Sequence, residues 1–405
     1  MHLESGSRVS MALGVLWVAV SWTPLAAAPA DGPWTLVDSP NPGPAQNRLI
    51  DVTRLGSNGV LALGREYAEY FGLEWGGTEW LEIAMPPQED IGMGYALDSL
   101  GSTPGGDVWA VGIVGIDPFT GLPLAMRYNG TEWDRIETVP LEPAGRNGHV
   151  FDVSAVSDDD IWAVGNSDGP LAVHWDGSEW TENSPPAPGN RIHDTFAVAA
   201  VASDDVWAVG HFENVAPAEP LGFYPMILHW DGTSWSHFPN PGQALERRTL
   251  LDVEAVAADD VWVSGYWWYG LCEHPSGASY CDPFFMHWDG SEWSVVPSPA
   301  DTERAYVSEL TAFASDDIWA STGAEYMHWD GTEWSVVAAP DVPGAETVRH
   351  GSGMVAVGPD VAWSVGRWEP ADGGWTRTLS ERYRASLFAD GFESGDTSAW
   401  SAVVP

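Results

Sequence analysis

Apolar and polar residues alternate with a period of two in many short stretches of the chain, and no stretch keeps the period of an amphipathic helix over a useful length. In one clear example, residues 151–157 alternate, and residues 161–165 form a run rich in β-branched and aromatic side chains. A third run ends at His174, and a fourth opens at Trp180. Between these two, Asp176-Gly177 is a pair preferred in tight hairpins whose central residues both have positive φ. The pattern predicts four short antiparallel strands.

This four-strand unit recurs along the chain at intervals of roughly 50 residues, the length typical of one propeller blade. Four copies share an alternating strand, an acidic turn, an Ile-Trp or Val-Trp pair and a His-Trp-Asp-Gly hairpin. They begin at Phe151, Phe196, Leu251 and Glu309, and weaker copies begin at Ile50, Leu97 and Met354. Seven copies predict an all-β fold, a seven-bladed β-propeller of four-stranded antiparallel blades.

The seventh copy predicts how the ring closes. After Tyr383 it lacks the hairpin and the outer strand of the other copies, whereas residues 33–40 match the outer strand at 293–299. The N-terminal strand is therefore expected to complete the last blade, which takes its other three strands from the C-terminal side. Such pairing leaves no open strand edge at the join. The propeller is predicted to span residues 31–386.

Two side-chain types recur at fixed positions of the repeat. Tryptophan occupies the second strand of six copies, and histidine precedes the tryptophan of the third strand in four copies. Because the histidine positions are spread around a ring, they do not converge on one metal, and packing or turn stabilisation is their expected role. The tryptophans are expected to pack between blades. An aromatic ligand cage is the alternative for the tryptophans. The residues are Trp109, Trp162, Trp207, Trp262, Trp319 and Trp363, and His174, His229, His287 and His328.

The charge of the chain limits its partners. The formal net charge is -42, and all 16 basic residues are arginine, so the chain is lysine-free. Such a chain repels nucleic acid and anionic membrane surfaces, because binding to phosphates depends on clustered Lys and Arg. The acidity suits a saline habitat, although a GC-rich genome would also favour arginine over lysine.

The ends of the chain carry separate predictions. Residues 1–30 have the pattern of a secretory signal peptide, with an apolar run at 11–20 and small residues up to Ala30, near which cleavage is expected. The mature protein is therefore predicted to be secreted, or to lie at the cell surface or in the periplasm. No later stretch approaches the roughly 20 apolar residues of a membrane helix. Residues 387–405 predict a flexible tail, either a sorting tag or an unstructured end.

Two cysteines, Cys272 and Cys281, lie in one loop. An exported protein meets an oxidising compartment, so a local disulfide is predicted. Zinc is the competing interpretation, but two thiols without a second clustered pair do not favour it.

With these motifs, the chain resembles a family of secreted bacterial β-propeller repeat proteins, whose copies read approximately LxxVxAxSxxDVWAVG followed by LxxHWDGTxWSxVPSPNP. The likeness covers about Pro33 to Arg384. That family has no defined activity, so the resemblance implies the fold and export and adds no chemistry. The chain is also similar at a distance to kelch and galactose-oxidase-like propellers, although its second strands end in a single glycine, as at Gly165, where kelch repeats have a pair.

A propeller has two faces, and they are expected to differ here. The turns from first to second and from third to fourth strand form one face, and they are tight and acidic. The remaining connections form the other, here called the loop face, and they vary in length, as binding loops on rigid scaffolds do. Aromatic rings on these loops suit a sugar or peptide surface, or else they cover gaps in the loops themselves. The aromatic candidates are Tyr224, Trp267 and Trp268.

The scarce arginines recur in the connections that lead from one blade to the next, with histidines beside them. On an acidic protein, basic groups near the mouth of the central channel would attract an anionic ligand. The alternative is that each arginine pairs with the acidic residue opening the next inner strand, namely Asp51, Asp152, Asp252 or Glu309. The candidate ligand residues are Arg48, Arg146, His149, Arg191, His193, Arg247, Arg304 and His350, and Arg248 and Arg349 follow the same pattern.

No Ser-His-Asp arrangement, phosphate-binding glycine loop or His-x-x-x-His pair stands out, so no catalytic residue or cofactor is predicted, while calcium held by the Asp-rich turns stays open. The predicted function is an extracellular, non-enzymatic ligand-binding or scaffold propeller. It is expected to act as a monomer and to bind a carbohydrate, peptide or protein on its loop face. The alternative is a carbohydrate-active enzyme, a lyase or glycoside hydrolase, that uses acidic residues near the channel.

Overall fold

The structure is a computed structural model that describes residues 33–57, 59–67, 69–86, 94–115, 120–136, 141, 146–188, 193–213, 223–239, 241, 248–267, 282–299 and 306–385. The predicted signal peptide, the predicted tail and both cysteines lie outside the described residues. Within the described ranges, no helix is long and apolar enough to cross a membrane.

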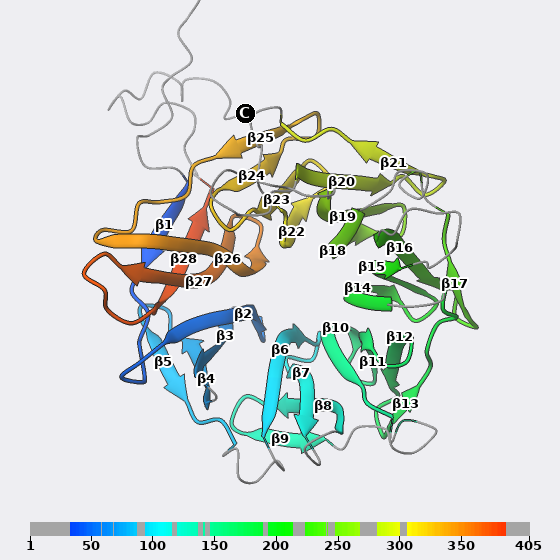
Figure 1. The fold of residues 1–405 in the computed structure, drawn as a ribbon, viewed down its shortest axis with the longest axis horizontal. Helices are drawn as coiled ribbons and strands as arrows, with labels where there is room; N and C mark the ends of the chain where they lie inside the picture. Colours follow the sequence, from blue (N-terminus) through cyan, green and yellow to red (C-terminus); the bar gives the residue numbers. More distant parts are fainter. Residues whose placement is uncertain are drawn as a thin grey trace, which may run out of the picture.

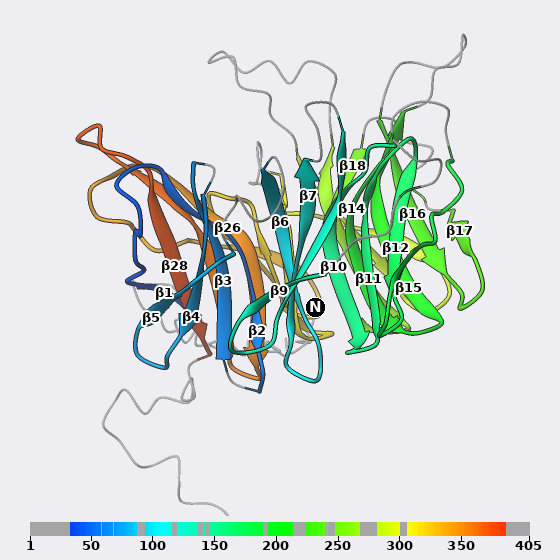
Figure 2. The same cartoon turned by 90° about the horizontal axis from the view of Figure 1, so that it is seen from below.

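Seven four-stranded antiparallel sheets stand in a ring, as the repeat count predicts (Figure 1). In each blade the strands follow one another from the channel outwards, and they are here called a, b, c and d. Seen from the side, the strands run roughly along the axis of the ring (Figure 2). The connections from b to c and from d to a therefore meet at one end of the ring, the loop face.

The first four blades each take four consecutive strands. Blade 1 is β2 (Asn47–Leu55), β3 (Gly59–Glu66), β4 (Glu69–Trp75) and β5 (Trp80–Ile83). Blade 2 is β6 (Tyr95–Ser102), β7 (Val108–Gly115), β8 (Gly121–Tyr128) and β9 (Trp133–Ile136). Blade 3 is β10 (His149–Ser157), β11 (Asp160–Asn166), β12 (Pro170–Trp175) and β13 (Trp180–Glu182). Blade 4 is β14 (His193–Ala202), β15 (Asp205–Glu213), β16 (Phe223–Trp230) and β17 (Trp235–His237).

The last three blades include the composite one. Blade 5 is β18 (Arg248–Ala257), β19 (Asp260–Trp267), β20 (Asp282–Trp288) and β21 (Trp293–Val296). Blade 6 is β22 (Glu309–Ala314), β23 (Asp317–Ser321), β24 (Tyr326–Trp329) and β25 (Trp334–Val337). Blade 7 is β26 (Ala345–Gly358), β27 (Val361–Pro370), β28 (Arg377–Arg384) and, as its outer strand, β1 (Trp34–Val37).

The predicted closure by the N-terminal strand is confirmed. Strand β1 pairs antiparallel with β28, from Trp34 opposite Tyr383 to Val37 opposite Ser380. The Trp34 side chain is only 1% exposed, and its ring stacks on Tyr326 of blade 6 at 4.3 Å between centroids. The first strand thus contributes both backbone pairing and core to the last blade.

The repeated tryptophans pack between blades, as expected from their spacing. In blade 3, the ring of Trp162 lies 5.1 Å from Trp230 and 5.3 Å from Trp235 of blade 4. The repeated histidines hold the adjacent turn: His174 lies against Trp162 and places Nε2 2.8 Å from Oδ1 of Asp160. The same contact, at 2.8 to 2.9 Å, recurs at His229–Asp205, His287–Asp260 and His328–Asp317. The sequence pattern did not predict this histidine–aspartate pair.

The hairpins between strands c and d differ from the predicted geometry. In blade 3 only Gly177 has positive φ, at 90°, whereas the prediction required it of Asp176 as well. The Asp176 carboxylate instead accepts hydrogen bonds from the backbone N–H groups of Ser178 and Glu179, both at 2.9 Å. The aspartate therefore closes the turn with its side chain, which leaves one position that needs glycine.

Candidate anion-binding site

A pocket of about 520 Å³ opens on the loop face where the first and seventh blades meet. Its volume lies within the range of roughly 300 to 1,000 Å³ that is typical of small-ligand sites. Beside it, the backbone N–H of Asn47 donates to the carbonyl of Thr376 at 2.9 Å and joins the two blades. The lining residues are Gln46, Asn47, Arg48, Arg65, Tyr67, Arg367, Glu369 and Thr376.

Arginines face each other across neighbouring strands in both blades. Arg48 of β2 is the register partner of Arg65 of β3, and Arg349 of β26 is the register partner of Arg367 of β27. Like charges directly opposite one another in a sheet cost about 0.2 to 1 kcal/mol per pair. Two such pairs at one junction are therefore unfavourable for the fold itself.

These four arginines make no ion pair with any carboxylate in the part of the chain that the structure describes. Burial, and then repulsion from Arg65, Arg367 and Arg349, lowers the pKa of Arg48. An arginine nevertheless stays protonated at neutral pH, so the pocket remains positively charged. Three of these arginines, Arg48, Arg65 and Arg367, line the pocket and give it the charge to hold an anion.

Two aromatic rings stand at the rim of the pocket. Tyr67, which lines it, and Trp375, next to the lining residue Thr376, are each 56% exposed. Their ring centroids lie 6.4 Å apart, with the planes at 67°. Tyr67 has a φ of 48°, a left-handed conformation that a bulky side chain rarely adopts. Exposed rings held in this way are suited to contact a ligand.

Of the residues predicted to bind a ligand, the structure brings Arg48 to this pocket. Arg146 is instead paired with Glu182 at 3.0 Å and with Asp168 at 3.4 Å, and not with Asp152 as the alternative required. His149 places Nε2 2.5 Å from Oδ2 of Asp98. Both side chains are thus engaged within the protein.

The remaining predicted site residues lie elsewhere or cannot be placed. His193 and Tyr224 are buried, and the ring of Tyr224 stacks on Phe212 at 5.4 Å. The guanidinium of Arg248 lies over the ring of Trp267, with 4.4 Å between its Cζ and the ring centroid. Arg191, Arg247, Arg304 and Trp268, as well as Cys272 and Cys281, lie outside the described residues.

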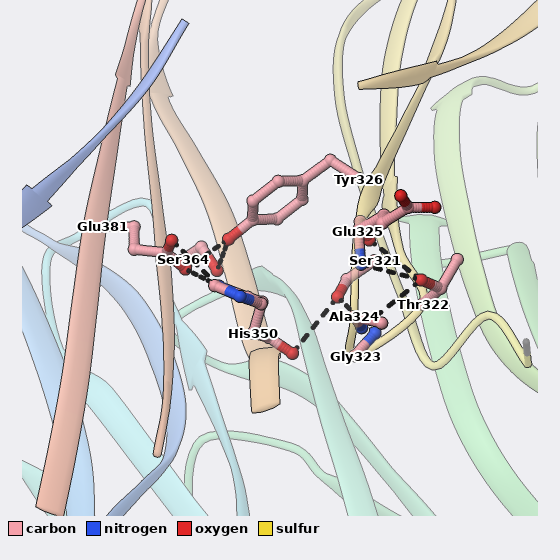
Figure 3. A network of polar contacts seen from close by, with 9 residues as sticks. All are labelled: Ser321, Thr322, Gly323, Ala324, Glu325, Tyr326, His350, Ser364 and Glu381. Atoms are coloured by element: carbon pink, nitrogen blue, oxygen red, sulfur yellow. Dashed lines mark hydrogen bonds and ion pairs between the residues drawn. The ribbon is translucent and has the colours of Figure 1, made fainter. Parts of the chain in front are cut away.

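His350 belongs to a buried network between blades 6 and 7 (Figure 3). Its Nδ1 lies 3.0 Å from both carboxylate oxygens of Glu381, whose side chain is fully buried. The hydroxyl of Tyr326 contacts Glu381 and Ser364 at 2.6 Å each. Burial and then the Glu381 charge raise the pKa of Tyr326, so its hydroxyl stays protonated. The network holds the composite blade against its neighbour and is closed to a ligand.

The acidic residues of the inner strands, Asp51, Asp152, Asp252 and Glu309, line the mouth of the central channel. Asp51 accepts hydrogen bonds from the backbone N–H groups of Val52 and, in blade 2, Leu100, both at 2.7 Å. Asp252 accepts in the same way from Leu310 of blade 6 at 2.6 Å. Each carboxylate thus satisfies an N–H on the inner edge of the next blade, beside a bulge in its own strand. The arginine–aspartate pairing considered from the sequence does not occur at Asp51 or Asp252.

The channel mouth is a poor ligand site by size. Its cavity measures about 100 Å³, well below the range of roughly 300 to 1,000 Å³ for small-ligand sites. No group of three or more His, Cys, Asp or Glu side chains arranged to hold a metal occurs among the residues that the structure describes.

Sequence reasoning missed Arg65, Arg367, Tyr67 and Glu369 of the pocket. A signal for the two arginines was present, because each follows the glycine that recurs in strand b, as Gly64-Arg65 and Gly366-Arg367. The corresponding position holds Ile113, Asn166, His211 and Tyr266 in blades 2 to 5. A basic residue at one repeat position in only two copies marks the junction between those two blades.

No protein-family model matches the chain, and no curated protein matches it in sequence. The structure titled "YCF48 bound to D1 peptide" is 13% identical, with a TM-score of 0.56 over 89% of this chain and 98% of its own. YCF48 from Cyanidioschyzon merolae is 13% identical, with a TM-score of 0.53 over 87% and 98%. The GH93 α-L-arabinofuranosidase of Fusarium graminearum with arabinobiose is 13% identical, with a TM-score of 0.48 over 87% and 97%.

At these identities the likeness shows the propeller fold alone. The resemblance to secreted bacterial repeat proteins, and the distant one to kelch propellers, stay predictions from the sequence.

Proposed function

We propose that this protein is a non-enzymatic binding propeller that holds an anionic ligand in the pocket between its first and seventh blades. The observation that carries the proposal is that Arg48, Arg65 and Arg367 line one pocket in a chain of net charge -42, with Arg48 and Arg65 as register partners. This like-charge pair opposes folding, and the three arginines have no carboxylate partner among the described residues. An anion in the pocket would offset their repulsion.

The proposal places the protein outside the cytoplasm, on the strength of the predicted signal peptide in residues 1–30. Binding is favoured over hydrolysis because the channel carboxylates Asp51 and Asp252 each accept two backbone hydrogen bonds. A structural neighbour of the same fold, YCF48, has been solved with a D1 peptide bound. Propellers of this architecture can therefore serve as binding scaffolds.

The test uses citrate, a small tricarboxylate, as the anion. Citrate should raise the melting temperature of the wild-type protein at constant ionic strength, because it binds the folded state alone. Arg48→Gln and Arg367→Gln should each lose most of this rise. Without citrate, Arg48→Gln should be more stable than the wild type by about 0.2 to 1 kcal/mol, because one like-charge pair is removed.

The matched control is Arg127→Gln, since Arg127 is paired with Asp107 at 3.7 Å and Asp134 at 3.6 Å, in blade 2. This variant should keep the full citrate effect and should gain no stability. If Arg48→Gln were less stable than the wild type and still responded fully to citrate, the arginines would be structural and the proposal would fail.

A further inference from the structure

We infer that the anion in this pocket is the acidic group of a sugar, so that the ligand is a short uronic or sulfated saccharide; this rests on the proposed function. None of the eight lining residues has an aliphatic side chain, and all eight carry an amide, hydroxyl, carboxylate or guanidinium group, although the buried Asn47 amide is bonded within its own loop. Such a lining matches a molecule that carries hydroxyl groups on all sides.

The pocket offers few of the features by which proteins usually bind peptides. Peptides bind by adding a strand to a sheet edge or by placing apolar side chains in pockets. The outer edge strands β5 and β1 contribute none of the lining residues, and no lining residue has an aliphatic side chain. A peptide carboxylate could meet the arginines, but the rest of the peptide would gain little.

The exposed rings of Tyr67 and Trp375 supply flat aromatic surfaces, which a simple anion does not need for binding. A sugar ring has faces of C–H groups that stack on flat aromatic surfaces, whereas an inorganic anion has no such face. The two rings are 56% exposed and 6.4 Å apart at the edge of the arginine cluster. The left-handed backbone of Tyr67, with φ of 48°, is strain of the kind that collects at ligand sites.

Two further polar side chains suit the hydroxyl groups. Glu369 and Gln46 line the pocket, are exposed, and make no hydrogen bond with other residues in the described ranges. Glu369 can accept hydrogen bonds from hydroxyl groups, while its charge opposes a ligand with densely packed anionic groups. The pocket therefore fits one acidic group on a polyhydroxylated body.

The charge of the whole molecule limits the length of the saccharide. With a net charge of -42, the surface around the pocket repels a long polyanion. The attraction of the arginines is screened over about 8 Å at physiological salt. A single acidic sugar, or the end of a chain, is thus favoured over the middle of a long one.

Calorimetric titration of the full mature chain tests the inference. The probes are trigalacturonate, a sulfated trisaccharide, a neutral trisaccharide and the triglutamate peptide. One of the two acidic sugars should bind at least about tenfold more tightly than triglutamate, a difference of about 1.4 kcal/mol. The neutral sugar should bind weakly, and the comparison of uronate with sulfate identifies the acidic group.

Two variants test the aromatic rim. Tyr67→Gly removes the ring and accepts the positive φ, and Trp375→Ala removes the second ring. Each should weaken binding of the preferred saccharide about three- to tenfold, and Trp375→Ala, which changes no lining residue of the pocket, should leave stabilisation by citrate unchanged. The control is Leu81→Ala, which removes a side chain that is 51% exposed on β5 of blade 1 and should change neither.

The outcomes separate the two claims. If triglutamate bound as tightly as the acidic sugars while citrate still stabilised the protein, the saccharide inference would fail and the anion pocket would stand. Loss of citrate and saccharide binding alike in both ring variants would also overturn the inference. If neither citrate nor any acidic probe bound the wild type, both the proposed anion pocket and the saccharide inference would be wrong.

Discussion

The carboxylates at the channel mouth connect neighbouring blades by hydrogen bonds, but burying their ionised form costs stability. This cost depends on pH. Asp51 bridges two blades through backbone N–H groups, and it is partly buried at the channel mouth. Burial, together with repulsion from Asp152, outweighs these hydrogen bonds and raises the pKa of Asp51 from its usual 3.8 to about 7. Burial likewise raises the pKa of Glu254 to about 7. At neutral pH, the folded state therefore carries partly ionised groups that it accommodates poorly.

The sign of the pH effect follows from linkage. A carboxyl whose pKa is higher in the folded than in the unfolded state stabilises the fold fully below the unfolded value, near 3.8, and this contribution is lost as pH rises through about 7. The melting temperature of the wild type should therefore fall between pH 5 and pH 8. Asp51→Asn should make this fall smaller, as measured by calorimetry at both pH values.

The control is Asp176→Asn in the turn of blade 3. Hydrogen bonds from Glu179 and Ser178 lower the pKa of Asp176 to about 2, so its contribution is lost only as pH falls from about 4 towards 2. Its variant should show the wild-type fall between pH 5 and pH 8. An unchanged fall in Asp51→Asn would mean that Asp51 is ionised normally in the folded state.

Among the strands, β1 has the greatest effect on the whole fold for its length. Its four residues pair with β28, and Trp34 lies between Tyr326, Trp319 and Tyr383 at 4.3 to 5.7 Å. Trp34→Ala should lower the free energy of unfolding by about 3 to 5 kcal/mol, because it removes a buried ring and leaves a cavity. Chemical denaturation measures this loss.

The exposed Trp375 provides the comparison for Trp34. Trp375→Ala should change the stability by less than about 0.5 kcal/mol, since the ring is 56% exposed. Equal losses in the two variants would indicate that the N-terminal strand is not part of the folded ring.

The strands were predictable from the sequence because the pattern of apolar and polar residues in each repeat marks where its strands lie. The run at 161–165 became β11, and the match between 33–40 and 293–299 identified the closing strand. The hairpin geometry was wrong at Asp176, since a side-chain oxygen replaced the backbone conformation that a two-residue turn requires. Local side-chain hydrogen bonds of this kind are not visible in a hydrophobic pattern.

The molecule as a whole carries far more negative than positive charge, 58 acidic residues against 16 basic ones. Such self-repulsion destabilises the compact state, and salt screens it. Raising sodium chloride from about 0.01 M to about 1 M shortens the screening length from roughly 30 Å to roughly 3 Å. The melting temperature at pH 8 should therefore rise across this range.

The same salt series at pH 4 is the control, because many carboxylates are then protonated and less charge remains to be screened. The rise should be clearly smaller there. A rise of equal size at both pH values would point to a general effect of salt on hydrophobic burial instead.

The candidate site was less predictable than the fold because it depends on the closed ring. The sequence pattern singled out Arg48, which lies at the start of β2, but Arg367 is far away in sequence, in the last blade. Blades 1 and 7 meet at the pocket because the ring is closed, through the pairing of β1 with β28 and through direct contacts such as that of Asn47 with Thr376. The sequence of a single repeat can mark one pocket residue as unusual, but it does not show that residues of the first and last blades are neighbours.

Ring closure also has a consequence for the order of synthesis. Blade 1, with Arg48 and Arg65, leaves the ribosome early, whereas Arg367 and strand β28 are made last. A nascent or truncated chain therefore has half a pocket and an unpaired first strand, however well its middle blades have folded. A ligand that needs both Arg48 and Arg367 would therefore bind only a chain whose ring has closed.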